Sequence, residues 1–210
     1  MNFEFTVTYE LLSAADRDGV VAEHLRRRLA PLGLVEVTTL SWIDGSKPPV
    51  RRMFQLQLLK GAAIKACWGF SLDFVPHISA GRVRWHRSSK SARLDVIVDP
   101  KDMPQASYLR GHSRLDSDLE RLMPEAIKRA ESDWKRGATL AGMLDLVRYL
   151  RDSRSNCFGY QMYTQLPLAF AFLSAKVGDK NEADQALTEY IERFELDDDE
   201  ASKLQRAAWA

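Results

Sequence analysis

The spacing of hydrophobic side chains changes partway along the chain, and this change constrains the fold more than any single motif. Between positions 64 and 74, large apolar side chains alternate with small or polar ones. A period of two predicts a strand with one buried face. The apolar face would carry Ile64, Ala66, Trp68, Phe70, Leu72 and Phe74, and the polar face Lys65, Cys67, Gly69, Ser71 and Asp73. Beyond about residue 115 the period becomes helical, so the chain is predicted to be α+β.

The first hundred residues are predicted to form a sheet with a helix packed on it. We expect the helix over residues 13–32, where Ser13 begins an S-x-x-D capping box and Gly33 supplies a C-terminal stop. A short strand is expected over residues 3–9. Strand-like runs separated by turn-forming residues then follow at 34–43, 52–59, 64–74, 82–87 and 93–98. Short connections between successive runs favour an antiparallel β-meander.

Helical spacing dominates the rest of the chain. Helices are expected at 115–135, 140–150, 167–177, 183–194 and 200–209. Pro124 marks a kink or a boundary in the first of them. The chain is thus divided into three parts: an α+β sheet region at 1–100, a connector at 101–114 and a helical region at 115–210. The sequence leaves open whether the sheet and helical regions share one core.

The net charge of +1 conceals two segments of opposite sign. Residues 47–93 contain ten Lys or Arg and one carboxylate, a balance of +9. Residues 179–200 contain ten carboxylates and two cations, a balance of −8. Charged runs are usually solvated, and the basic sheet could also lie against the acidic helices of the same chain. A third reading is a binding surface for a polyanion or an acidic protein.

Alternation concentrates the basic charge on one predicted face. Val83 and Trp85 occupy the positions expected to face inward. Arg82, Arg84 and His86 alternate with them and are therefore expected to point outward. If these strands pair with the strand over 64–74, Lys65 joins the same cationic face. The candidate binding residues are Arg82, Arg84, His86, Arg87, Lys90, Lys65 and His77. Nucleic acid is a conceivable ligand but is not favoured, because no RRM, KH, zinc-finger or helix-turn-helix signature is present.

No catalytic or cofactor motif is evident, so we assign no catalytic residue, no metal ligand and no cofactor. Cys67 and Cys157 match no metal-binding spacing and read as two separate reduced thiols. An acid–base or metal group remains as an alternative, built from Asp73, His77 and His86 with Asp95 or Asp99. We expect a cytoplasmic protein, because neither a secretory signal nor a membrane span is apparent.

Two stretches resemble known families. The run from Leu173 to Tyr190 resembles the turn and second helix of a single tetratricopeptide repeat, through Gly178, Asp179, Ala183, Ala186 and Tyr190. This resemblance implies a helical hairpin. Residues 12–100, with Gln55-Leu56-Gln57 and Trp68-Gly69-Phe70, resemble uncharacterised bacterial α+β domains, some of them similar to immunity proteins that neutralise toxins.

Two functions are therefore expected as alternatives. The first is a non-catalytic bacterial protein that binds a protein partner, with toxin immunity as one form of that role. The second is a polyanion-binding protein, or an enzyme acting on a phosphorylated ligand or nucleic acid through the basic sheet face. The oligomeric state is left open.

Overall fold

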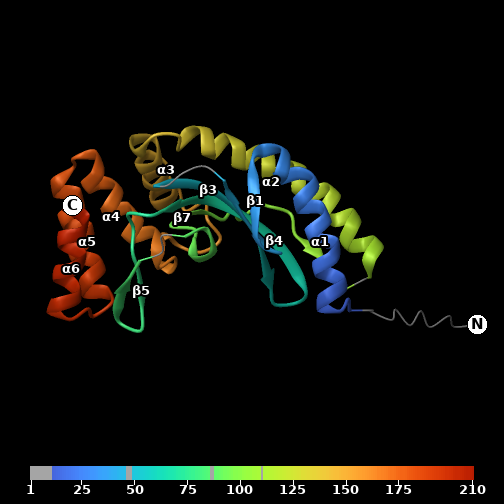
Figure 1. The fold of residues 1–210 in the computed structure, drawn as a ribbon, viewed down its shortest axis with the longest axis horizontal. Helices are drawn as coiled ribbons and strands as arrows, with labels where there is room; N and C mark the ends of the chain where they lie inside the picture. The colour runs from blue at the N-terminus through green and yellow to red at the C-terminus, as the bar shows by residue number, and fades with distance from the viewer. Residues whose placement is uncertain (1–10, 46–48, 86–87, 110) are drawn as a thin grey trace, which may run out of the picture.

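The computed structural model describes residues 11–45, 49–85, 88–109 and 111–210, and its architecture is α+β as predicted. A helix precedes an antiparallel sheet, and helices make up the second half (Figure 1). The strands are β1 (Leu34–Thr38), β2 (Ser41–Asp44), β3 (Val50–Leu59), β4 (Ala63–Leu72), β5 (His77–Ser79), β6 (Arg82–Arg84), β7 (Val96–Val98) and β8 (Ala106–Ser107). The α-helices are α1 (Ala14–Leu29), α2 (His112–Arg136), α3 (Leu140–Ser153), α4 (Gln165–Val177), α5 (Lys180–Arg193) and α6 (Asp198–Trp209). Short 3₁₀ turns lie at Ala30–Leu32, Ser89–Ser91 and Tyr160–Met162.

Helix α1 begins where the sequence predicts but ends at Leu29, and a 3₁₀ turn completes the predicted range to residue 32. The Ser13 hydroxyl accepts a 3.2 Å hydrogen bond from the backbone N–H of Asp16. Gly33 follows the 3₁₀ turn with a φ of +79°, a conformation that glycine adopts without steric cost. One face of α1 is buried through Val21, His24, Leu25 and Leu29. The short strand expected over residues 3–9 lies outside the described residues.

The main sheet is antiparallel, with strand order β1-β2-β3-β4-β7 and β8 paired to part of β4. The run over 34–43 forms two strands rather than one, because the chain reverses between Thr38 and Ser41. Strands β3 and β4 pair along ten consecutive positions. After β4 the meander is interrupted. Strands β5 and β6 form a separate two-stranded sheet, here called the basic hairpin, so the run beginning at Arg82 does not join the main sheet.

Both faces of β4 are buried, which corrects the expectation of an exposed polar face. Trp68 on the apolar face donates a 2.8 Å hydrogen bond to Asp133 of α2. On the other face Lys65 is only 3% exposed and contacts Cys157, which follows α3. Gly69 shares that face with a φ of +148°, and a Cβ there would lie 1.8 Å from the Val96 carbonyl oxygen. The expectation that Lys65 contributes to an exposed cationic surface is therefore wrong.

The helical half shares one hydrophobic core with the sheet. Helix α2 continues through Pro124 and packs against α1 and β4. Helix α4 is almost fully buried, and α4 and α5 form the helical hairpin expected from the repeat-like sequence, with Gly178 (φ +90°) at the bend. In Figure 1, α5 and α6 lie at one end of the molecule and α1 at the other, with the basic hairpin beside α6. In the described part of the chain, no helix combines the length and the apolarity that crossing a membrane requires.

Candidate functional site

The structure brings some of the predicted basic residues together on the basic hairpin. Arg82 and Arg84 are exposed on β6, and the strand register places His77 opposite Arg84. Lys90 is exposed in the 3₁₀ turn that follows. Two further predicted residues, His86 and Arg87, lie outside the described residues. Val83 faces the core as expected, but the expectation for Trp85 is wrong, because its side chain is 40% exposed.

Among the described residues, no ion pair joins the basic segment to the acidic segment. In the basic segment, Arg51 pairs with Asp73, Arg52 with Asp44, and Lys65 with Asp99. The acidic segment finds its cations elsewhere: Asp179 and Glu182 pair with Arg148 of α3, and Asp199 and Glu200 with Lys203 of α6. Among the described residues, no carboxylate pairs with the exposed cations Arg82, Arg84, Lys90 and Arg93. Basic charge is therefore left open to solvent on and after the basic hairpin.

The basic hairpin packs against α6 through one buried carboxylate. The backbone N–H of Val83 donates a 2.7 Å hydrogen bond to Glu200, which is 7% exposed. The pKa of Glu200 is held below its ordinary value by the hydrogen bond from Lys203 and then by that from the Val83 amide. Beside this contact lies a hollow of about 340 Å³ lined by Val83, Trp85, Lys203, Arg206, Ala207 and Ala210. We call this hollow the Trp85 groove.

A second hollow shares lining residues with the Trp85 groove. It has a volume of about 510 Å³ and is lined by Pro49, Asp73, Phe74, Trp85, Lys176, Ala207 and Ala210. Trp85, Ala207 and Ala210 line both hollows. An exposed Trp flanked by cations and two shallow hollows is the composition typical of a protein-contact surface. Sequence alternation missed it by assigning Trp85 to the core.

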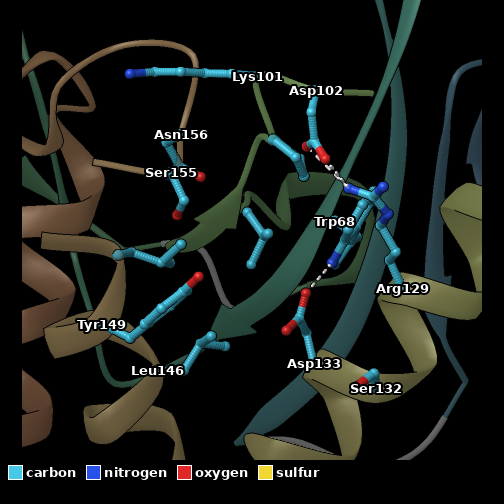
Figure 2. Close-up of a pocket in the computed structure, with 13 residues that line it drawn as sticks. Trp68, Lys101, Asp102, Arg129, Ser132, Asp133, Leu146, Tyr149, Ser155 and Asn156 are labelled. Carbon is cyan, nitrogen blue, oxygen red and sulfur yellow. Dashed lines mark hydrogen bonds and ion pairs between the residues drawn. The ribbon is translucent and has the colours of Figure 1, made fainter. Parts of the chain in front are cut away.

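A separate cavity of about 480 Å³ opens between α2, α3 and the segment after β7 (Figure 2). Asp133 and Trp68 lie at its wall, joined by their 2.8 Å hydrogen bond. Burial raises the pKa of Asp133, although the Trp68 hydrogen bond and nearby arginines act in the opposite sense. Arg129, one turn before Asp133 on α2, donates to both oxygens of Asp102 at 2.9 Å, and this bond lowers the pKa of Asp102. Tyr149 faces the same space from α3 (Figure 2).

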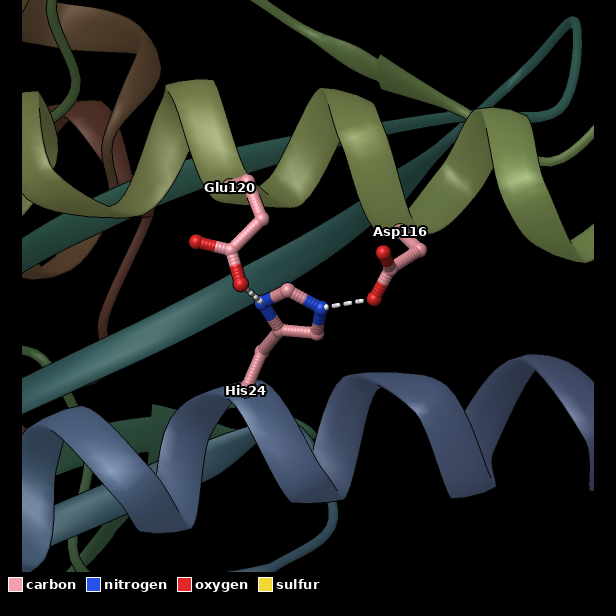
Figure 3. A group of neighbouring side chains, drawn as sticks. All are labelled: His24, Asp116 and Glu120. Carbon is pink, nitrogen blue, oxygen red and sulfur yellow. Dashed lines mark hydrogen bonds and ion pairs between the residues drawn. The ribbon is translucent and has the colours of Figure 1, made fainter.

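A third group joins α1 to α2 and was not anticipated from the sequence (Figure 3). Buried His24 lies with Nε2 2.8 Å from Asp116 and Nδ1 3.8 Å from Glu120. The ligand atoms of these three residues lie within 4.8 Å of one another, close enough to hold a metal ion. However, the two carboxylates face opposite ring nitrogens, and Glu120 is already paired with Arg27 and Arg28. We interpret the arrangement as an ion-pair network that holds α1 against α2.

The carboxylates of the acid–base alternative contact other groups in the described part of the chain, and His86 lies outside it. Asp73 pairs with Arg51, whereas Asp99 pairs with Lys65. Asp95 accepts hydrogen bonds from the Leu72 amide at 2.7 Å and from Gln165 at 3.1 Å. Within the described ranges the one cluster with metal-ligand spacing is that of His24.

Comparisons with protein-family models, with curated proteins and with solved structures found no match to this chain. The interpretation of the site consequently depends on the chemistry of its own residues.

Proposed function

We propose that this chain is a non-catalytic binding protein whose basic hairpin and Trp85 groove contact an acidic surface of a partner protein. The observation that carries the proposal is the selective pairing of charge. Buried or half-buried cations of the basic segment have carboxylate partners, whereas Arg82, Arg84, Lys90 and Arg93 are exposed without one among the described residues. Such uncompensated charge steers an oppositely charged protein and fixes its register.

Trp85 supplies the apolar part of the proposed contact. Trp85 is 40% exposed and lines both hollows, so a partner could bury it without rearranging the hairpin. Buried Trp and Arg side chains contribute most to the free energy of many protein interfaces. The hairpin itself is anchored to α6 by Val83 and Glu200, which keeps Trp85 and the arginines in a fixed relation.

A folded acidic protein fits this surface better than a nucleic acid does. The first turn of α6 places Asp198 and Asp199 on the helix that packs against β6, and both are exposed. A phosphate backbone carries negative charge along its whole length, so it would meet these carboxylates as well as the arginines. A protein can place its carboxylates only where they meet cations. The resemblance to immunity proteins favours a toxin as the partner, and the two free thiols favour a cytoplasmic setting.

A charge-reversal experiment tests the proposal. Wild-type protein, the double variant Arg82→Glu/Arg84→Glu and the control Lys60→Glu/Lys128→Glu are each used to capture proteins from the source cell. The control reverses the same amount of charge at exposed positions outside the basic hairpin. An acidic protein retained by the wild type and the control should then be purified and titrated against all three. We expect a 1:1 complex that weakens at least tenfold in the hairpin variant and weakens with added salt.

Two results would contradict the proposal. One is equal affinity of the hairpin variant and the control for the purified partner. The other is tighter, salt-sensitive binding of duplex or single-stranded DNA or RNA than of any acidic protein, which would favour the polyanion alternative. Circular dichroism of both double variants checks that neither change disturbs the fold.

The cavity between α2 and α3 supports a second candidate function, the binding of a small cationic ligand. Asp102 is neutralised by Arg129, but Asp133 has no cation within ion-pair distance among the described residues. The rings of Trp68 and Tyr149 line the same space (Figure 2). Aromatic rings with a carboxylate form the usual environment of a bound amine. A panel of primary and quaternary amines should shift the indole fluorescence of the wild type and not of Asp133→Asn. No shift with any amine would exclude this candidate.

A further inference from the structure

Lys65 and Cys157 come into contact although 92 positions separate them in the sequence. Lys65 projects from β4, where its side chain is buried, and Cys157 lies in the segment between α3 and α4, where it is half-buried. The Lys65 Nζ donates a hydrogen bond to the Cys157 Sγ at 2.5 Å. An amine nitrogen and a thiol sulfur at this separation need no rearrangement to react with each other once one of them is activated.

Neighbouring groups hold these two atoms together. The Cys157 backbone N–H donates a 2.7 Å hydrogen bond to the Asp99 carbonyl oxygen. The Asn156 side chain accepts from the Asp99 N–H at 2.8 Å and donates to the Ile97 carbonyl at 2.9 Å. The segment carrying Cys157 is therefore attached to the end of β7, next to β4 in the sheet. The position of Sγ is set by backbone pairing rather than by the side chain alone.

Asp99 can accept a proton from Lys65. Its carboxylate is 1% exposed, forms an ion pair with Lys65 and accepts a 2.7 Å hydrogen bond from the Tyr163 hydroxyl. Burial by itself would lower the pKa of Lys65, but the bonds to Asp99 and Cys157 outweigh it and raise the pKa. Lys65 is therefore an ammonium at neutral pH. The adjacent Asp99 carboxylate can take a proton from this ammonium, so the neutral amine can form without bulk water.

The second thiol of the chain has none of these features. Cys67 is fully buried, and burial raises the pKa of its thiol far above the ordinary range. A buried thiol with a raised pKa is a poor nucleophile. Cys157 combines access to solvent with a donor ammonium at its sulfur, which is the environment of an oxidisable cysteine. The two cysteines are thus chemically distinct.

We propose that Lys65 and Cys157 form a peroxide-responsive covalent cross-link between Nζ and Sγ. In the first step hydrogen peroxide oxidises the Cys157 thiol to a sulfenic acid and is reduced to water. In the second step Asp99 takes a proton from the Lys65 ammonium, and the free amine attacks the sulfur. The N–S bond forms, the S–O bond breaks, and the departing hydroxide takes a proton from nitrogen to leave as water. One peroxide is consumed, two waters form, and the protein loses two hydrogens. A thiol reductant reverses the bond.

Peptide mass spectrometry after peroxide treatment of the full-length protein tests the proposal. The cross-link should lower the intact mass by about 2 Da. Trypsin cannot cleave after a modified Lys65, so the digest should contain residues 61–82 joined to residues 155–176. A disulfide between Cys67 and Cys157 would also lower the mass, but Lys65 would be cleaved and the joined peptide would begin at residue 66. A joined pair that retains one oxygen, about 14 Da heavier than the unmodified peptides, would contradict a direct N–S bond, because the two steps above leave no oxygen in the product.

Three variants separate this reaction from its alternatives. Cys67→Ser should cross-link like the wild type, and Cys157→Ser should not. In Lys65→Gln/Asp99→Asn the buried charges are removed together, so the fold does not have to bury an unpaired carboxylate. In that double variant the sulfenic acid on Cys157 should persist and be trapped by dimedone. Oxidation of wild-type Cys157 to sulfenic or sulfinic acid with no joined peptide would overturn the proposal. Equal dimedone trapping in the wild type and the double variant would overturn it too.

Discussion

The backbone amide of Val83 in the basic hairpin is hydrogen-bonded at 2.7 Å to the side chain of Glu200 in α6, 117 positions later in the sequence. This bond connects the segment that carries the exposed arginines to the helix that carries the last acidic residues of the chain. It also explains why Glu200 is buried although its neighbours Asp198 and Asp199 are exposed.

Glu200→Ala should loosen the basic hairpin. The variant removes the acceptor of the Val83 amide, so hydrogen exchange at Val83 should accelerate several-fold. Since the pKa of Glu200 is lowered in the folded protein, its contribution is present at neutral pH and is lost as the pH falls through that lowered pKa. Amide exchange measured by NMR at Val83, with Val98 in the main sheet as reference, checks this. Unchanged protection at Val83 would show that other contacts hold the hairpin.

Lys65→Met should destabilise the protein strongly. It leaves Asp99 buried without a cation, and breaking a buried ion pair in this way costs about 3–5 kcal/mol. Lys65→Gln/Asp99→Asn should cost clearly less. Because the pKa of Lys65 is raised in the fold, the wild-type pair should keep its stabilising effect below the ordinary lysine value of 10.5 and lose it as the pH rises beyond. Urea unfolding from pH 7 to pH 11 measures both effects. A double variant with a lower free energy of unfolding than Lys65→Met would contradict this account.

Asp133→Asn should leave the protein as stable as the wild type or more stable at pH 7. The amide oxygen can still accept the Trp68 hydrogen bond, and the burial of a charge is avoided. A raised pKa in the fold means that the charged form of Asp133 opposes folding. This penalty is complete above the raised pKa and disappears as the pH falls below the ordinary value for an aspartate. The difference between variant and wild type in denaturant unfolding should therefore shrink from pH 7 to pH 4. A variant that is less stable at pH 7 would show that the carboxylate has a favourable partner.

Gly69→Ala should disrupt the pairing of β4 with β7. The added Cβ would lie 1.8 Å from the Val96 carbonyl oxygen at a φ that L-residues rarely adopt, which should cost about 3 kcal/mol or more. The matched control is Gly19→Ala in α1, where nothing lies within 4 Å of the added methyl group. That change should raise the free energy of unfolding by about 0.5–1 kcal/mol. Thermal and urea unfolding of both variants provides the comparison, and equal effects would refute the close-approach argument.

Chelation should leave the stability of the protein unchanged. Glu120 is paired with Arg27 and Arg28, and Asp116 with the His24 imidazole, so both carboxylates have partners without an ion. We expect the same melting temperature with EDTA and with equimolar Zn²⁺. A rise in melting temperature with zinc in the wild type, absent in His24→Ala, would instead identify a metal site.

The elements were largely predictable from the sequence because their signals are local. The capping box at Ser13, the alternation over β4 and the turn at Gly178 each specify a structure within a few residues. The two-stranded form of the run over 34–43 was missed because the turn at Thr39 and Leu40 contains no glycine or proline.

The site depends on contacts that no local pattern encodes. Alternation assigned Lys65 to an exposed face because a lysine on one side of a strand usually meets solvent. Its actual partners, Asp99 and Cys157, are 34 and 92 positions away. The same reasoning placed Trp85 inside the protein, because the alternation of side chains along a strand does not indicate whether that strand belongs to the main sheet. Once β6 pairs with β5 alone, the side chain that follows it is left partly exposed.

Strand β4 pairs unequally on its two edges, and this inequality affects the order in which the strands assemble. On one edge β4 meets β3 across a three-residue turn, and ten successive positions pair. On its other edge β4 pairs with β7 and β8, which are synthesised later. Pairing with these strands closes much longer loops. The hairpin of β3 and β4 should therefore assemble first, and for a time it presents an unpaired strand rich in large apolar residues. Refolding yield should accordingly fall as protein concentration rises, because a second molecule competes for the edge that β7 eventually covers.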